Sequence, residues 1–309
     1  MSTAQVLDRT FSLYRHNFFL FAGIAALPPA MVLVGQLLMM ASSALAPRLS
    51  GSLPSYVMVV PGVVLFIFVY MLGYALATGA TVHAVSRVHL GSPVTIAASY
   101  VAVRSLLWRM LGIIILVGLM AGGAFIVCYL GALIPVTQIP ARVRVTGYLV
   151  PILMAILALA GIVAGIVWGS RIYCRYSLAV PACVVEGLPF RMCMRRSKFL
   201  SKQALFRIFL VYLLMLFVLL ALSLLLSLPN YVVLAFSSGT GKVLFVEVWN
   251  LISSFLAGTI SAPFGTVAVA LIYYDQRVRK EAFDLELMME AIAVTPPSPV
   301  ATAASPSVG

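Results

Sequence analysis

The densest group of chemically active side chains lies between Arg191 and Arg207, a segment with six Lys and Arg residues and no acid. Helical spacing of i, i+4, i+7 and i+11 places four of these bases on one stripe of a helix, with apolar residues between them. Such a helix lies among lipid headgroups, where each base near an anionic surface contributes about 1 kcal/mol. We predict that anionic lipid is bound by Arg191, Arg195, Arg196, Lys198, Lys202 and Arg207. A phosphorylated ligand would suit the same bases, and the pattern by itself favours a segment that sets the orientation of the chain in the membrane with generic lipid contact.

A second group of polar side chains lies where long apolar segments end. Asp275 follows two tyrosines, and a carboxylate near a low-dielectric boundary is costly unless it is paired. Arg171 and Arg175 occupy the corresponding end of another apolar segment, so we expect an arginine to pair with Asp275. A structural ion pair is favoured here over a substrate or proton site. The residues predicted to form this ion pair or to line a polar cavity are His83, Arg171, Tyr173, Arg175, Tyr274 and Asp275.

Patterns typical of enzymes and metal sites are missing from the sequence. His83 and His89 are six residues apart, a spacing that does not put both on one helix face, and no Cys or acid lies close by. The run Gly239 to Lys242 lacks the first glycine of a phosphate-binding loop and is followed by Val243 instead of Ser or Thr. We therefore predict no catalytic residue, no metal, no cofactor and no enzymatic activity.

The composition places these side chains on an all-α integral membrane protein. Hydrophobic residues make up 63% of the chain and charged residues only 9%, whereas about a quarter of the residues of a soluble domain are charged. Six apolar stretches are long enough to cross a bilayer, which takes roughly 20 residues. The predicted spans are 17–43, 56–82, 108–135, 147–170, 205–229 and 246–274.

The positions of the bases orient the predicted spans. Sixteen of the twenty Lys and Arg residues fall in four clusters, 9–15, 87–109, 171–207 and 277–280, and each pair of neighbouring clusters is separated by two apolar stretches. Positive charge on short loops stays on the cytoplasmic side, so both termini are predicted to be cytoplasmic. Because topology explains the net charge of +12, we expect no nucleic-acid partner.

The chain also shows weak self-similarity with a period of about 96 residues. Gly91-Ser92-Pro93 aligns with Gly187-Leu188-Pro189, and a basic amphipathic stretch precedes each odd-numbered span. We predict three parallel two-span repeats over about 3–88, 89–184 and 185–280, each preceded by an interfacial amphipathic helix. Small residues at four-residue spacing make the even-numbered spans candidates for the inner helices.

The predicted domain boundaries follow from this organisation. One membrane domain covers 1–292, ending with a short amphipathic helix after the last repeat, and the Pro-, Ala- and Ser-rich stretch 293–309 is predicted to be a disordered tail.

Three segments resemble a group of bacterial membrane proteins of unknown function. The matching motifs are Leu7-Asp8-Arg9-Thr10-Phe11, Arg175-Tyr176-Ser177-Leu178-Ala179-Val180-Pro181 with Glu186-Gly187, and Tyr273-Tyr274-Asp275 with Arg277-Val278-Arg279-Lys280-Glu281. The group is related to the YciC-like proteins and to the membrane domain appended to some glycerophosphoryl diester phosphodiesterases. The resemblance implies a six-span protein of the bacterial inner membrane. The hydrolytic activity of the fused enzymes belongs to a separate soluble domain, so it is not transferred to this chain.

Two functions compete on these grounds. The first is a non-enzymatic membrane protein that binds anionic lipid or a membrane-protein partner at the cytoplasmic face. The alternative is a transporter or channel with a cytoplasm-facing polar cavity between the even-numbered helices. A membrane-embedded enzyme ranks third because paired acids, metal ligands and an activated nucleophile are missing.

Overall fold

The computed structural model describes residues 3–49, 55–137, 149–202, 204–236 and 240–281, and these ranges are helical without any strand. A single 3₁₀ turn, Arg104–Leu106, leads from α5 into α6. The α-helices are α1 (Thr3–His16), α2 (Phe18–Ala25), α3 (Leu27–Leu49), α4 (Ser55–His89), α5 (Ile96–Val103), α6 (Leu107–Thr137), α7 (Leu149–Tyr176), α8 (Ala179–Glu186), α9 (Phe190–Ser201), α10 (Leu205–Phe236) and α11 (Thr240–Glu281).

The long helices coincide with the predicted spans. Five helices in the described ranges are long and apolar enough to cross a membrane, and α2 with α3 forms a sixth candidate that is bent by 42°. Pro28 and Pro29 begin α3 directly after this bend, where the proline rings leave the preceding carbonyls without amide donors. The predicted all-α fold is thereby confirmed for the described residues, and the long apolar helices are compatible with the predicted multi-pass membrane protein. The expected amphipathic helix up to residue 292 and the tail 293–309 lie outside the described residues.

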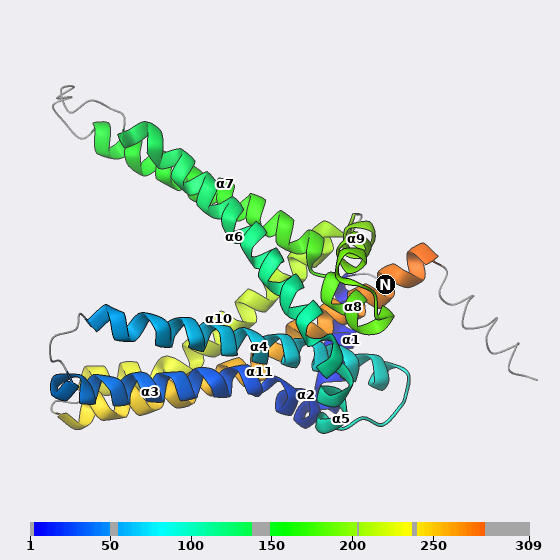
Figure 1. The fold of residues 1–309 in the computed structure, drawn as a ribbon, viewed down its shortest axis with the longest axis horizontal. Helices are drawn as coiled ribbons and strands as arrows, with labels where there is room; N and C mark the ends of the chain where they lie inside the picture. Colours follow the sequence, from blue (N-terminus) through cyan, green and yellow to red (C-terminus); the bar gives the residue numbers. More distant parts are fainter. Residues whose placement is uncertain (1–2, 50–54, 138–148, 203, 237–239, 282–309) are drawn as a thin grey trace, which may run out of the picture.

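The long helices form two bodies that diverge from a common base (Figure 1). The hairpin of α6 and α7 projects to one side, while α3, α4 and the first part of α11 run side by side, and α10 packs along α11. In the most apolar 18-residue stretch of each helix, 56% of the α11 residues are buried, compared with 28% for α4 and 17% for α7. The prediction of inner even-numbered helices is therefore right for the sixth span and wrong for the fourth.

The glycines of α7 explain why this helix is not central. A Cβ atom at Gly161 would lie 2.5 Å from the Cβ of Ala132, and one at Gly169 would lie 3.0 Å from the carbonyl oxygen of Ala121. Both neighbours belong to α6, so the small-residue stripe closes the hairpin and does not face the other spans.

Short helices precede the odd-numbered spans where the sequence predicts amphipathic ones. α1 leads into α2, α5 into α6 and α9 into α10, and α8 is an additional short helix that the sequence did not indicate. Gly91 and Gly187, which align in the predicted repeat, both have positive φ, at 72° and 64°. A residue without a Cβ adopts this conformation at little cost. We call the end of the molecule that holds α8, α9 and the C-terminal end of α11 the basic end.

Candidate lipid-binding helix and central cavity

The helix α9 packs on the basic end through one face. Cys193, Ser197, Leu200 and Ser201 are buried on that face, at the spacing of one helical stripe. The hydroxyls of Ser197 and Ser201 donate hydrogen bonds to the carbonyl oxygen of Arg175, at 3.0 and 2.9 Å. These bonds occupy a carbonyl at the end of α7 that has no partner within its own helix. They fix which way α9 faces.

The opposite face of α9 carries four exposed bases. We call these residues the basic stripe: Arg191, Arg195, Lys198 and Lys202. None of them forms an ion pair with another described residue, although acids are present at this end of the molecule. Within the part of the chain that the structure describes, the stripe therefore presents four positive charges without an acidic partner along one helix.

Arg196 points inward, unlike its neighbours in the predicted lipid-binding set. Its guanidinium lies 3.1 Å from Glu186 of α8 and donates a hydrogen bond of 2.5 Å to Glu281 of α11. Tyr273 donates to Glu186, and Arg277 lies 3.4 Å from Glu281. We call these five residues the inner cluster. Burial by itself lowers the pKa of Arg196, but the hydrogen bonds and charges of the two glutamates outweigh it, and the net shift is upward.

Arg207, the last member of the predicted lipid-binding set, pairs with the buried Asp275. Its guanidinium lies 2.5 Å from the carboxylate, and Arg279 approaches the same oxygen at 3.1 Å. The expected pairing of Asp275 with an arginine is therefore present, but the partners are not Arg171 or Arg175. The reason is packing, because α10 lies along α11 whereas α7 packs against α6.

The other residues of the predicted cavity set do not come together. Arg171 and Arg175 are exposed, and the buried Tyr274 packs against the ring of His89 with 5.5 Å between centroids. The Nδ1 atom of His83 is buried without a hydrogen-bond partner in the described part of the chain. Of the six residues, only Tyr173 lines the central cavity, which lies between α4, α6, α7 and α11.

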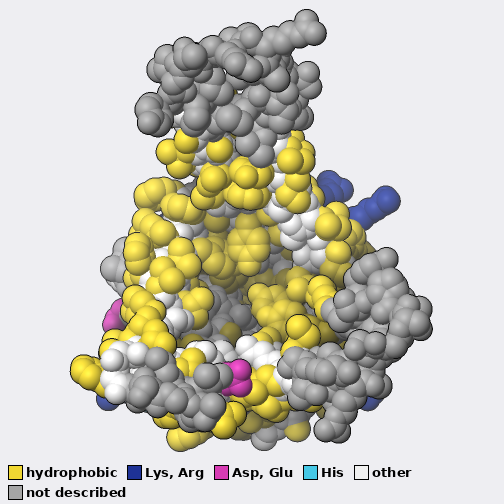
Figure 2. Space-filling model, turned by 90° about the vertical axis from the view of Figure 1, so that its left-hand side faces the viewer, with side chains coloured by type: hydrophobic (Ala, Val, Ile, Leu, Met, Phe, Trp, Pro, Cys, Tyr) yellow, Lys and Arg dark blue, Asp and Glu magenta, His cyan; other side chains and the backbone are white. Residues whose placement is uncertain are grey.

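That cavity has two adjoining lobes. One of about 690 Å³ lies between α4, α6, α7 and α11, and the other, of about 490 Å³, is bordered by α3, α4, α10 and α11. The two lobes are adjacent and share six lining residues: Tyr74, Thr78, Tyr212, Ala262, Gly265 and Thr266. Figure 2, seen from the end opposite the basic end, shows a hollow with mainly hydrophobic walls. The cavity thus opens away from the basic end.

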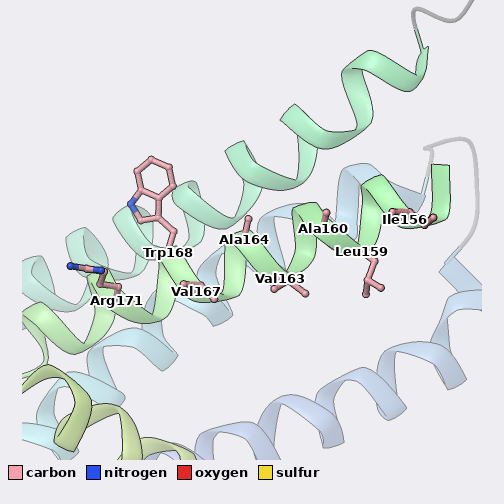
Figure 3. Close-up of a pocket in the computed structure, with 8 residues that line it drawn as sticks. All are labelled: Ile156, Leu159, Ala160, Val163, Ala164, Val167, Trp168 and Arg171. Atoms are coloured by element: carbon pink, nitrogen blue, oxygen red, sulfur yellow. The ribbon is translucent and has the colours of Figure 1, made fainter. Parts of the chain in front are cut away.

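The outer face of α7 is a third feature. An open apolar surface runs along this helix from Ile156 to Val167 and ends at Trp168 and Arg171 (Figure 3). Exposed apolar side chains followed by a tryptophan and an arginine are typical of a helix that passes from hydrocarbon to headgroups. The face has the character of a lipid-facing surface.

Sequence reasoning missed the inner cluster. The signal was present in Glu186, one of only eight acids in a chain of 309 residues, which sits next to an apolar segment and therefore needs a partner. Its partners come from α9 and α11, which only the fold brings together.

The described residues contain no group of three His, Cys, Asp or Glu side chains that could hold a metal. Comparison of the chain with protein-family models, with curated proteins and with solved structures finds no match. The resemblance to the YciC-like proteins therefore stays a prediction.

Proposed function

We propose that this chain is a non-enzymatic, multi-pass membrane protein that binds anionic lipid headgroups through the basic stripe of α9. The observation that carries the proposal is the division of this helix into two faces. The polar side chains of the inner face form hydrogen bonds and ion pairs within the protein, whereas the four bases of the outer face have no acidic partner among the described residues.

Electrostatic attraction to anionic headgroups supports the proposal. A base near an anionic surface contributes about 1 kcal/mol, so four bases held on one helix would contribute about 4 kcal/mol, roughly a thousandfold in affinity. Because the serine hydroxyls and Arg196 hold α9 in place, little further ordering is needed when lipid binds.

The proposal includes the orientation and organisation predicted from the sequence. The basic end faces the cytoplasm of a bacterial cell, both termini lie on that side of the inner membrane, and the chain consists of three parallel two-span repeats. The paired helix starts after Gly91 and Gly187 support the repeat. The positive clusters support the orientation. An acidic membrane-protein partner could use the same stripe.

A transporter or channel is the second candidate, and the central cavity supports it. In this structure the cavity opens away from the basic end, and Tyr176 and the α8 residues Val180 and Pro181 are among the residues that line it. Transport would require a second conformation in which α8 moves and opens the cavity at the basic end.

The proposal is tested by native mass spectrometry of the full chain in detergent, where topology cannot affect access to the stripe. One variant changes Arg191, Arg195, Lys198 and Lys202 to Gln. A matched control changes four other exposed bases, Arg9, Arg15, Arg87 and Arg104, to Gln. We expect the first variant to lose bound phosphatidylglycerol at least tenfold relative to phosphatidylcholine and the control to lose far less. Equal losses would show that charge acts only generically.

A further inference from the structure

Five hydroxyl-bearing side chains from four helices converge inside the central cavity. We call them the hydroxyl cluster: Tyr74 and Thr78 of α4, Tyr173 of α7, Tyr212 of α10 and Thr266 of α11. The rings of Tyr173 and Tyr212 meet edge to face with 5.1 Å between centroids. Tyr74 is close enough to interact electrostatically with both of them. Residues distant in sequence thus build one polar patch.

The patch lies well inside the apolar part of the protein. Thr266 precedes Asp275 by nine residues on α11, which is about 14 Å along a helix axis. Within the cluster Tyr74 interacts with the hydroxyl of Thr78, and Tyr173 with that of Tyr212, so these side chains form a small hydrogen-bonding network on an otherwise apolar wall. A ligand that accepts or donates hydrogen bonds could join this network, because each hydroxyl can both donate and accept.

The remaining walls determine what kind of ligand fits. No charged side chain lines either lobe in the described part of the chain, and aliphatic and aromatic residues dominate. An ionised phosphate or carboxylate would be buried there without a counter-charge. The larger lobe lies within the range of about 300 to 1,000 Å³ that small-molecule sites occupy.

The route of entry indicates the source of the ligand. The rim of the larger lobe includes Phe68 of α4 and Leu119 of α6, which are both exposed. Both residues belong to candidate membrane spans, so this edge of the lobe, at α4 and α6, would face the hydrocarbon of the bilayer.

We infer that the central cavity binds an uncharged lipid with a free hydroxyl group, of the diacylglycerol type, taken up from the bilayer between α4 and α6. Its acyl chains contact the apolar walls. Its hydroxyl and ester carbonyl oxygens form hydrogen bonds with the hydroxyl cluster. This site is separate from the basic stripe and does not depend on the anionic-lipid proposal.

The test measures binding of dioctanoylglycerol to the detergent-solubilised full chain by native mass spectrometry, with dioctanoyl phosphatidic acid as the charged analogue. We expect one dioctanoylglycerol per chain and at least a tenfold preference over the acid. The double variant Tyr212→Phe with Thr266→Val keeps the shape of the cavity but removes two hydroxyls, and it should weaken binding about tenfold, the effect of about one net hydrogen bond. Tyr231→Phe, an exposed tyrosine of α10 outside the cavity, is the matched control.

A second variant fills the cavity. Ala262 lines both lobes, so Ala262→Trp should abolish binding while the thermal unfolding midpoint stays within a few degrees of that of the wild type. If this variant does not fold, the double variant decides the outcome. Unchanged binding by the double variant, or equal binding of dioctanoylglycerol and dioctanoyl phosphatidic acid, would overturn the inference. The basic-stripe Gln variant should bind dioctanoylglycerol as the wild type does.

Discussion

Arg195 and Arg196 are adjacent in the sequence, yet a rotation of about 100° between them on α9 places them in different electrostatic environments. Arg196 is half-buried between Glu186 and Glu281, whereas Arg195 is exposed and has no acidic partner among the described residues. One face of the helix uses charge to hold three helices together, and the other leaves charge available to a ligand. The difference shows that the number of bases in a segment does not reveal their role, which depends on the rotation of the helix.

The largest expected effect is on the inner face. Arg196→Met should lower the free energy of unfolding by about 2 kcal/mol, because it leaves Glu186 and Glu281 half-buried with fewer compensating charges. The cost stays below that of a fully buried pair since Tyr273 and Arg277 still contact the two acids. Thermal unfolding in detergent, followed by circular dichroism, measures the change. Arg195→Met is the matched control, and an equal loss of stability in both variants would contradict the division into two faces.

A substitution that strains the backbone before α9 should affect both faces of the helix. Gly187 ends α8 with a φ of 64° and sets the direction in which the chain enters α9. Gly187→Ala should cost about 1 kcal/mol, because a Cβ disfavours the left-handed conformation even where no atom obstructs it. Both faces of α9 should be affected, with a lower unfolding midpoint and weaker phosphatidylglycerol binding. Loss of lipid binding without any loss of stability would count against this role.

On the outer face, a single substitution should change binding and not stability. Arg195→Gln removes one of four exposed charges and should weaken phosphatidylglycerol binding by about 1 kcal/mol, or roughly fivefold. The unfolding midpoint should stay the same within error, as is usual for exposed positions. Native mass spectrometry at matched lipid concentrations gives the affinity. A shift in stability comparable to that of Arg196→Met would show that Arg195 has a structural partner.

The smallest expected effect is the change of the unfolding midpoint with salt concentration. Raising the salt concentration from about 50 to about 500 mM should weaken phosphatidylglycerol binding, because exposed charges are screened beyond a Debye length of about 10 Å at 0.1 M. The unfolding midpoint should fall only slightly, because the inner cluster is half-buried and screened less. Lipid binding that is insensitive to salt would point to contacts other than the basic stripe.

The sequence was sufficient to predict the helices but not which helices pack against one another. Apolar length predicted every long helix, and the spacing of the bases predicted the exposed stripe, since both are properties of a single helix. The predicted partner of Asp275 was wrong because the pairing depends on which helix packs beside α11, and tertiary contacts determine that packing. The hydroxyl cluster was missed for the same reason: single tyrosines and threonines on four separate helices show no pattern in the sequence.

The most direct test of the central claim is to label the protein with a photoreactive phosphatidylglycerol in nanodiscs and to map the adducts by mass spectrometry. Phosphatidylcholine with the same photoreactive headgroup linker is the control lipid. Phosphatidylglycerol should label the peptide containing residues 191–202 several times more than phosphatidylcholine does, and changing the basic stripe to Gln should remove the difference. Equal labelling of this peptide by both lipids would contradict it.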